Sequence, residues 1–299
     1  MKPVLERALV GAGALALDAA LGEPPSRLHP VVGMGSLLAA LRRRSRAETP
    51  SGQLAEGAVG LTAVVAAAAL GAVATRGAVR RLPCGTAIAG EAAALSTLLA
   101  LRGLREAVEG VRRALEAGHV EAARTGAARD LVSRDTASLG SAELSAAAIQ
   151  SLAENLSDSV VAPLLAYAAG GLPAAAAYRA LNTADAMWGY RAPELLYRGR
   201  AAARADDVAN VIPARLTALY IAARSPRPHE ALRVALRDHA LAPSPNGGWP
   251  IAAMAGGLGV RLAKRGSYDF NAGARLPGPA DIGAALEVVG RVHVWGPAP

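Results

Sequence analysis

Acidic and amide side chains lie close together in the stretch from Arg129 to Tyr167, RDLVSRDTASLGSAELSAAAIQSLAENLSDSVVAPLLAY. Glu154 and Asp158 are four residues apart, so on a helix their carboxylates share one face and could hold one divalent cation. An isolated pair of this kind is more often a solvated helix face. This pair directly precedes a run of 20 uncharged residues, where a buried charge needs a partner, and that position favours a functional site.

Two further stretches combine the same residue types. In RALNTADAMWGYR, Asn182 and Asp185 are three residues apart and arginines flank them. In RADDVANVIPAR, Asp206 and Asn210 are expected on one helix face, next to Asp207. Each cluster alone is more simply explained as a structural salt bridge. Three apolar helices that each carry Asp and Asn beside Arg indicate more, because carboxylate oxygens suit Mg²⁺ and arginines suit phosphates.

Two loops also contain candidate residues. The segment APSPNGGWP, residues 242–250, alternates prolines with an Asn-Gly-Gly turn, whose backbone amides could approach an anion. A tight surface turn without a ligand is an equally good interpretation. The segment LDAALGEPPSRLHPV places His29 before a proline, and a lone histidine there is more often structural than catalytic. The sequence contains no Walker loop, no dinucleotide-binding glycine motif, no nucleophile elbow and no HExxH zinc motif.

The chemistry of these residues gives a set of candidate roles. The candidate catalytic residues are Arg134, Asp135, Asn155, Asn182 and Asp185. The candidate substrate- and phosphate-binding residues are Arg191, Arg204, Ser244 and Asn246. The candidate metal ligands are Glu154, Asp158, Asp206 and Asp207. We expect the charged segment from Arg134 to Asp158 to lie against the other two clusters and form one metal and phosphate site that faces the cytoplasm.

The elements that must position these residues are predicted to be helices. The chain is 52% hydrophobic but only 3% aromatic, a composition rich in small apolar residues that suits closely packed helices. We predict an all-α, polytopic membrane protein that forms a single domain over residues 1–299. The predicted membrane helices are near 4–21, 57–75, 82–101, 159–178 and 208–223, and the predicted cytoplasmic helical region is 102–157. The alternative is a soluble protein with alanine-rich buried helices.

Prolines and glycines interrupt one of these runs. Pro163, the Gly170-Gly171 pair and Pro173 fall within 159–178 and predict a broken or re-entrant helix, which is tolerated at membrane depth where it lines a protein cavity.

Charge and cysteine content narrow the partners and the topology. The net charge of +8 fits anionic lipid, phosphorylated small molecules or nucleic acid, and the shortage of aromatic residues argues against nucleic acid. Cys84 is the only cysteine, so an internal disulfide is excluded. Arginines in 42–46 and in 102–134 fall on one side of the predicted spans, which the positive-inside rule assigns to the cytoplasm.

Several motifs in order resemble one family. LDAALGEPPSRLHPV, RDTASL, SLAENLSDSVVAPL, YRALNTADAMWGYR, AAARADDVANVIPARLTAL and PSPNGGWPIAAMAGGLGVRL together resemble the CobD/CbiB family of cobalamin biosynthesis proteins, from about Leu17 to Leu262. The family usually has a histidine and an acidic residue where this chain has Ala242 and Ile251.

The resemblance implies a multi-pass protein of the bacterial inner membrane. It implies an enzyme of the adenosylcobinamide-phosphate synthase type, which joins aminopropanol or its O-phosphate to the f propionate of adenosylcobyric acid. ATP as co-substrate and Mg²⁺ are the expected requirements. The partners expected are these small molecules, the lipid bilayer and other cobalamin-pathway enzymes, without nucleic acid. The rival hypothesis is a membrane scaffold or carrier that holds corrinoid intermediates without catalysis, and it predicts no ATP consumption.

Overall fold

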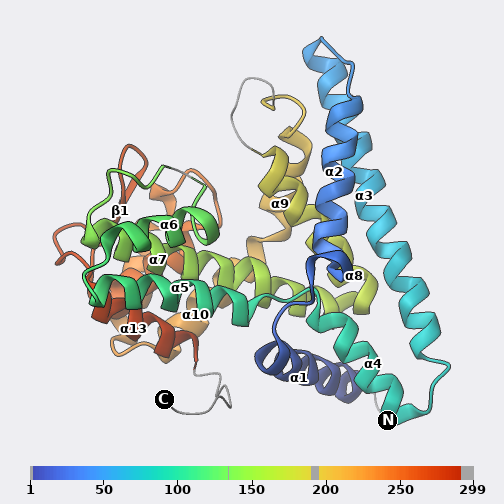
Figure 1. Ribbon diagram of the computed structural model, residues 1–299, viewed down its shortest axis with the longest axis horizontal. Coiled ribbons are helices and arrows are strands. Elements are labelled where there is room, and N and C mark those ends of the chain that lie inside the picture. The colour runs from blue at the N-terminus through green and yellow to red at the C-terminus, as the bar shows by residue number, and fades with distance from the viewer. Residues whose placement is uncertain (1–2, 134, 190–194, 291–299) are drawn as a thin grey trace. The chain divides into compact units, whose positions relative to one another are not determined.

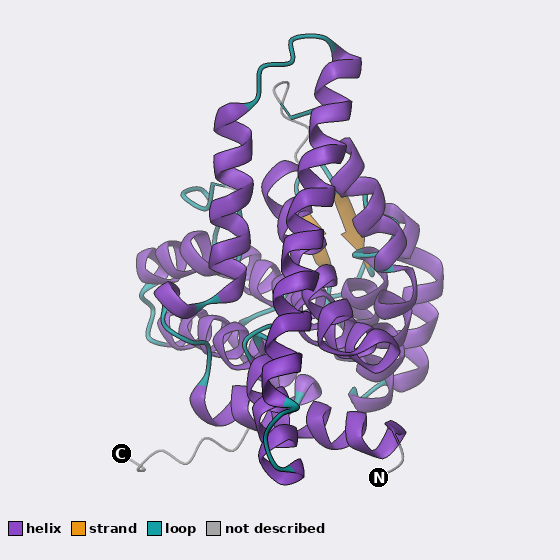
Figure 2. Cartoon of the chain, turned by 90° about the vertical axis from the view of Figure 1, so that its right-hand side faces the viewer, coloured by secondary structure: helices purple, strands orange, loops and turns teal. Residues whose placement is uncertain are grey.

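A computed structural model describes residues 3–133, 135–189 and 195–290 of the chain. These residues are mostly helical, as the sequence predicts, and they include one small antiparallel hairpin (Figure 2). The hairpin pairs β1 (Leu262–Lys264) with β2 (Tyr268–Phe270) and sets two fully buried side chains, Leu262 and Phe270, opposite each other. This cross-strand apolar pair explains why a short strand forms in an otherwise helical chain.

The chain divides into two compact units, and each is described by itself. The first unit comprises Met1–Ala100 and Ala162–Ala209, and the second comprises Leu101–Val161 and Asn210–Pro299. The α-helices of the first unit are α1 (Pro3–Leu21), α2 (Pro30–Arg44), α3 (Pro50–Val79), α4 (Cys84–Ser96), α8 (Ala162–Trp188) and α9 (Arg200–Ala209).

Local sequence signals start α2 and α3, which run antiparallel (Figure 1). The backbone N–H of Val31 donates to Nδ1 of His29, at 3.2 Å, so His29 caps α2. The structural interpretation of this histidine is therefore confirmed. Thr49 caps α3 in the same way, since its Oγ1 accepts from the N–H of Gly52 at 3.2 Å.

Small residues let α3 pack closely within the first unit. A Cβ on Gly57 would lie 1.9 Å from the carbonyl oxygen of Arg198, and one on Gly60 would lie 3.0 Å from the ring of Trp188. Trp188 at the end of α8 is 2% exposed, so this packing buries a large aromatic side chain next to the polar cluster described below.

Helix α8 is broken at Gly171, as the glycines and prolines in this run predict. Gly171 has φ 72° and ψ −164°, a conformation open in practice only to glycine. The break frees backbone carbonyls, and Arg7 of α1 donates through Nη1 to the carbonyl oxygens of Ala168, at 2.5 Å, and Ala169, at 3.1 Å. A helix break in apolar surroundings is stabilised when such carbonyls find donors. That the segment is re-entrant in a membrane stays a prediction.

A buried ion pair lies beside the same break. Glu91 of α4 is 3% exposed, and its Oε1 lies 3.2 Å from Nε of Arg76 and accepts a hydrogen bond from the Tyr167 hydroxyl at 3.0 Å. The single carboxylate in an apolar helix is thus paired and hydrogen-bonded, as burial of a charge requires.

The second unit consists of α-helices together with the β1–β2 hairpin. Its α-helices are α5 (Leu101–Glu116), α6 (Val120–Asp130), α7 (Ser141–Leu156), α10 (Val211–Arg224), α11 (Pro228–Asp238), α12 (Gly248–Leu258) and α13 (Pro279–Val289). Every residue of α12 except Trp249 is buried, so this helix is the centre of the core. It can pack this closely because a Cβ on Gly256 would lie 2.4 Å from the carbonyl oxygen of Glu230 in α11.

Two helical stretches of the described chain are long and apolar enough to cross a membrane. These are Pro50–Val79 and Ser141–Trp188, which contain the predicted spans 57–75 and 159–178. A third is added if Gly85–Ser96 and Leu101–Glu116 form one broken span. The other two predicted spans, 4–21 and 208–223, do not pass by length and composition, and α10 has only 14 residues where about 20 are needed.

Candidate functional site

In the first unit, a chain of hydrogen bonds joins α8 to α9. Nη1 of Arg179, a buried residue with 7% exposure, donates to Oδ1 of Asn182 at 3.2 Å. The Nδ2 of Asn182 in turn donates to Oδ1 of Asp206 at 3.3 Å. The clusters around Asn182 and Asp206 therefore meet, and the amide connects a buried guanidinium to a carboxylate 24 positions further along the chain. The expected contact of both clusters with the segment from Arg134 to Asp158 stays a prediction.

Asp185 lies at the end of α8 against a glycine. A Cβ on Gly189 would fall 2.0 Å from Oδ1 of Asp185, and the N–H of Gly189 donates to the backbone carbonyl of Asp185 at 2.7 Å. A Cβ on Gly199 would fall 1.7 Å from the carbonyl oxygen of Trp188. Only glycine fits at these two positions, so close packing against the end of α8 explains Gly189 and Gly199.

Asp207 is the neighbour of Asp206 on α9. Burial raises the pKa of the Asp207 carboxyl, and Arg204 opposes this rise with a guanidinium 3.9 Å away. The Arg204 side chain is 76% exposed, so most of it faces solvent. A partly buried carboxylate with a raised pKa has a stronger tendency to bind a cation or a proton than an exposed one. Arg191, the other predicted phosphate-binding residue here, lies outside the described residues.

In the second unit, α7 presents Glu154 at the surface. Ile149, Leu152 and Leu156 are buried, and Glu154 is exposed, as the helical periodicity predicts. Asp158 is half-buried and lies in a π-helical turn, Ser157–Val161, that the sequence analysis did not foresee. In a π turn the hydrogen bonds run from residue i to i+5, so the simple four-residue alignment of Glu154 with Asp158 does not hold. Such turns occur frequently at functional sites.

The Pro-Ser-Pro-Asn loop lies next to Glu154. A Cβ on Gly247 would lie 3.0 Å from Oε1 of Glu154, so the loop and the carboxylate are in contact. The backbone amides of Asn246 and Gly247 donate to Oγ of Ser244, at 3.2 and 3.4 Å. These two amides are therefore engaged within the turn, as the alternative of a tight turn without a ligand predicts. Phosphate binding by Ser244 and Asn246 stays a prediction.

Arg215, Trp249 and His239 surround the same loop. Nη1 of Arg215 donates to Oδ1 of the buried Asn246 at 2.9 Å, and its guanidinium carbon lies 4.8 Å from the centroid of the Trp249 ring. The His239 ring also stacks on the Trp249 ring, with the ring centroids 4.0 Å apart. Sequence reasoning placed none of Arg215, His239 and Trp249 among the candidate residues. The sequence signal that could have found them is the Trp249-Pro250 pair after Asn-Gly-Gly.

The remaining predicted residues make local contacts. Oδ1 of Asp135 accepts from the N–H of Ala137 at 2.9 Å and shapes an exposed turn. Nδ2 of Asn155 donates to the carbonyl of Ser151 at 3.0 Å, within α7. Arg134 lies outside the described residues. These contacts are structural, and the catalytic roles of Asp135, Asn155 and Arg134 stay predictions.

The carboxylates fall into two groups, one in each unit. The first unit holds Asp185, Asp206 and Asp207, and the second holds Glu154 and Asp158. Among the described residues there is no group of three or more His, Cys, Asp and Glu side chains that could by itself hold a metal ion. A single site built from both groups stays a prediction.

Comparison with known proteins places the chain in a family. Residues 11–289 match the family model described as CobD/Cbib protein. A probable cobalamin biosynthesis protein CobD of Methanothrix thermoacetophila is 37% identical over 292 residues, which is 94% of this chain and 92% of the relative. The cobalamin biosynthesis protein CobD of Rhizobium meliloti is 40% identical over 84% of this chain and 80% of its own length.

A third relative agrees with these. The cobalamin biosynthesis protein CobD of Rhodobacter capsulatus is 38% identical over 298 residues, which is 93% of this chain and 91% of the relative. No solved structure matches the chain. The family model and the relatives cover both units, including the Asn182–Asp206 pair and the Pro-Ser-Pro-Asn loop, and the chain belongs to the CobD/CbiB family.

Proposed function

We propose that this protein acts in cobalamin biosynthesis as an ATP-dependent amide-forming enzyme. The substrates are adenosylcobyric acid and aminopropanol or its O-phosphate, and the product carries the new amide on the f propionate. Family membership supports the pathway, since the relatives are named for cobalamin biosynthesis. The observation that carries the choice of reaction is the Arg179–Asn182–Asp206 chain with Asp207 beside it, which combines cation-binding oxygens with a buried guanidinium.

The proposed reaction has two steps. In the first, the propionate oxygen attacks the terminal phosphorus of ATP, which gives an acyl phosphate and ADP. In the second, the amine nitrogen attacks the acyl carbon, the carbon–oxygen bond to phosphate breaks, and inorganic phosphate and a proton leave. A carboxylate and an amine do not condense in water without such activation. The enzyme must therefore bind polyanions and orient them, which positioned cationic groups do well.

The residues of the first unit fit Mg²⁺. Mg²⁺ is commonly held by one or two carboxylates, with waters and substrate phosphates at its other positions. Asp206 and Asp207 supply two carboxylates on one helix, and the raised pKa of Asp207 is relieved by a nearby cation. Bound Mg²⁺ would neutralise phosphate charge. Among the described residues no group of three or more such side chains could by itself hold a metal ion, so the proposed site depends on substrate phosphates to complete it.

Arginines on the same elements are proposed to bind phosphate. Arg204 is 76% exposed and is held only loosely by Asp207, at 3.9 Å, so its guanidinium can turn toward a phosphate. Arg179 has a different role, because it is buried and its Nη1 is engaged with Asn182. We assign Arg179 as the positioning residue that orients Asn182 toward Asp206, and Arg204 as the phosphate-binding residue.

We propose that the protein lies in the bacterial inner membrane and that its chain crosses this membrane more than once. The support is that Pro50–Val79 and Ser141–Trp188 are long and apolar enough to span. Single cysteines introduced at Ser45 and at Gly126, in a Cys84→Ser background, should both label from the cytoplasmic side with a membrane-impermeant maleimide. Labelling of the two positions from opposite sides would disprove this topology.

The reaction is tested with purified protein in detergent. The protein is incubated with adenosylcobyric acid, ATP, Mg²⁺ and aminopropanol or its phosphate. The mass of the corrinoid product is then measured by mass spectrometry. We expect amide formation and ATP consumption that depend on both the corrinoid and the amine. A carrier would consume no ATP under these conditions, and that result would reject the proposal.

Matched variants assign the site. Asp206→Asn should require much more Mg²⁺ for the same rate. Asp269→Asn, which removes a carboxylate paired with Arg261 in the second unit, should leave the Mg²⁺ dependence unchanged.

A further inference from the structure

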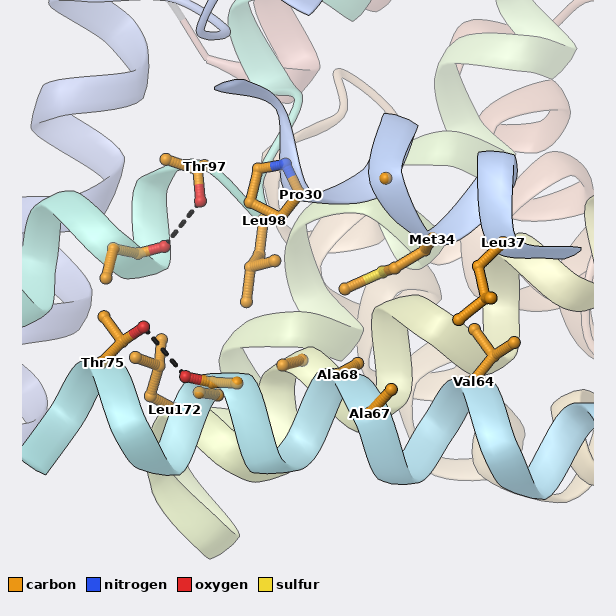
Figure 3. Close-up of a pocket in the computed structure, with 15 residues that line it drawn as sticks. Pro30, Met34, Leu37, Val64, Ala67, Ala68, Thr75, Thr97, Leu98 and Leu172 are labelled. Atoms are coloured by element: carbon orange, nitrogen blue, oxygen red, sulfur yellow. Dashed lines mark hydrogen bonds between the residues drawn. The ribbon is translucent and has the colours of Figure 1, made fainter. Parts of the chain in front are cut away.

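An apolar cavity of about 490 Å³ lies within the first unit, and none of the polar residues of the proposed reaction site is among the residues that line it (Figure 3). Side chains of α2, α3, α4 and α8 and of the turn after α4 line it, among them Met34, Val64, Leu98 and Leu172. Two of its lining residues on α2, Gly33 and Leu37, are exposed, and so are Ala67, Gly71 and Thr75 on α3. The cavity therefore reaches the surface between these two helices.

The lining offers no free side-chain hydrogen-bond donor to a polar ligand. It contains no ionisable side chain, and its hydroxyl groups come from Thr75 and Thr97. Both hydroxyls already donate within their own helical turns, Thr75 to the carbonyl of Gly71 at 2.9 Å and Thr97 to that of Ala94 at 2.8 Å (Figure 3). A ligand of this cavity is therefore a hydrocarbon, because a polar ligand would lose its hydrogen bonds to water without replacement.

The position of the cavity along α3 matches one leaflet of a bilayer. Its lining residues on α3 run from Val64 to Thr75, which at 1.5 Å per residue is about 16 Å, close to half of the roughly 30 Å hydrocarbon core. Outward-facing side chains in the same segment are apolar, since Leu70 is 68% and Val73 54% exposed. This step rests on the proposal that α3 spans the membrane.

Positive charge follows directly at the end of the cavity. Arg76 comes one residue after Thr75, and Arg80 and Arg81 lie within about 9 Å further along the chain at the end of α3. Arg76 is paired with Glu91, whereas the Arg80 side chain is 54% exposed and lies only loosely near Glu6, at 3.7 Å. Arg81 is exposed. Cations at this depth suit the phosphate of a lipid whose chain lies in the cavity.

We propose that the cavity is a binding site for one acyl chain of an anionic phospholipid, with the lipid phosphate at Arg80 and Arg81. The length of the lining, its lack of free hydrogen-bond donors and the cationic end of α3 together select this ligand. The bound lipid fills the space between α2 and α3. It is a structural lipid of the first unit and takes no part in amide formation.

Glycines provide a direct test, because the cavity can be filled without a clash. A Cβ on Gly71 meets nothing within 4 Å, and the same is true of Gly77, which lies on α3 but does not line the cavity. Gly71→Leu places a branched side chain in the space of the acyl chain, and Gly77→Leu is the matched control. Purified protein is titrated with phosphatidylglycerol in detergent, and bound lipid is counted by native mass spectrometry.

We expect one phosphatidylglycerol to bind the wild-type protein, and Gly71→Leu to weaken its binding roughly tenfold or more, since several methylene contacts are lost. Gly77→Leu should bind as the wild type does. Arg81→Gln should reduce the preference for phosphatidylglycerol over phosphatidylcholine, and Arg44→Gln, at the far end of α2, should not. Equal binding by Gly71→Leu and wild type, or equal loss in Gly77→Leu, would overturn the proposal.

Competition separates this proposal from the proposed reaction. Adenosylcobyric acid should not displace phosphatidylglycerol, and displacement would mean that the cavity belongs to the corrinoid. Gly71→Leu should retain the rate of amide formation in lipid-free detergent. If the wild-type protein forms no amide but still binds the lipid at this site, the reaction is wrong and the lipid site stands.

Discussion

Exchange of Asn182 for aspartate tests whether the Arg179–Asn182–Asp206 chain is part of a metal site. Asn182→Asp keeps the shape of the side chain but replaces the amide nitrogen, which donates to Oδ1 of Asp206 at 3.3 Å, with an oxygen. The other oxygen still accepts from Nη1 of Arg179, 3.2 Å away. The substitution therefore removes one hydrogen bond and introduces one negative charge between a cation and an anion.

The charge terms nearly cancel. At an effective dielectric constant of about 20, a unit charge 3.3 Å from Asp206 is repelled by about 5 kcal/mol, and one 3.2 Å from Arg179 is attracted by about 5 kcal/mol. The net cost is then the loss of the hydrogen bond from Asn182 to the Asp206 carboxylate. Because this bond is long, its contribution is about 1–2 kcal/mol. Without Mg²⁺ we therefore expect Asn182→Asp to lower the thermal midpoint by several degrees rather than to abolish folding.

Magnesium should reverse this loss if the cluster binds it. The variant adds a third carboxylate to Asp206 and Asp207, and a tenfold gain in affinity would add about 1.4 kcal/mol of stability at saturating Mg²⁺. The assay is thermal unfolding in detergent over a series of Mg²⁺ concentrations. The rise in midpoint with Mg²⁺ should be larger for Asn182→Asp than for wild type.

Gln150→Glu is the matched control for this exchange. It also turns an amide into an acid and loses a hydrogen bond, from Nε2 to the carbonyl of Ala263 at 3.1 Å, but in the second unit. Its midpoint should fall and should not recover with Mg²⁺. If Mg²⁺ raises the midpoints of Asn182→Asp and Gln150→Glu equally, or raises neither, the cluster around Asp206 is not a metal site and the reasoning fails.

Two other perturbations test the fold that carries the site. Gly171→Ala should destabilise the first unit by about 1–3 kcal/mol, because φ 72° with ψ −164° is accessible only to glycine. The control Gly77→Ala on α3 should be neutral or stabilising. Equal midpoints of the two variants in thermal unfolding would contradict the broken helix. The hydrogen bond from Arg237, with one from the N–H of Asn271, holds the pKa of the Asp238 carboxyl below its usual value. Its stabilisation is therefore complete above the unfolded-state pKa near 4 and is lost as the pH falls through the lower folded-state pKa, so the difference in thermal midpoint between wild type and Asp238→Asn should shrink over that range.

Much of the local structure is determined by the sequence. The uncharged run 57–75 lies in the long helix α3, the Gly170-Gly171 pair marks the break in α8, and His29 before Pro30 marks a helix start. Each of these features depends on the backbone preferences or the burial of neighbouring residues, so a local pattern is enough to predict it. The residue types of the site and the family resemblance were likewise readable from the motifs.

The contacts that make a site needed the tertiary structure. The sequence shows Asn182 and Asp206 in separate motifs, but only the packing of α8 on α9 decides that the amide of one reaches the carboxylate of the other. Periodicity treats Asp158 as an ordinary helical position, whereas the chain forms a π turn there.

The same limit applies to the Pro-Ser-Pro-Asn loop and to the cavity. The Asn-Gly-Gly turn of the loop suggests free backbone amides, yet the amides of Asn246 and Gly247 donate to Ser244. The side chain of Arg215, which contacts the loop at Asn246, comes from another helix. The cavity among α2, α3, α4 and α8 has no sequence signature at all. Hydrogen-bond partners and empty space depend on distances between residues far apart in the chain, and helix periodicity describes only which face of its own helix a residue occupies.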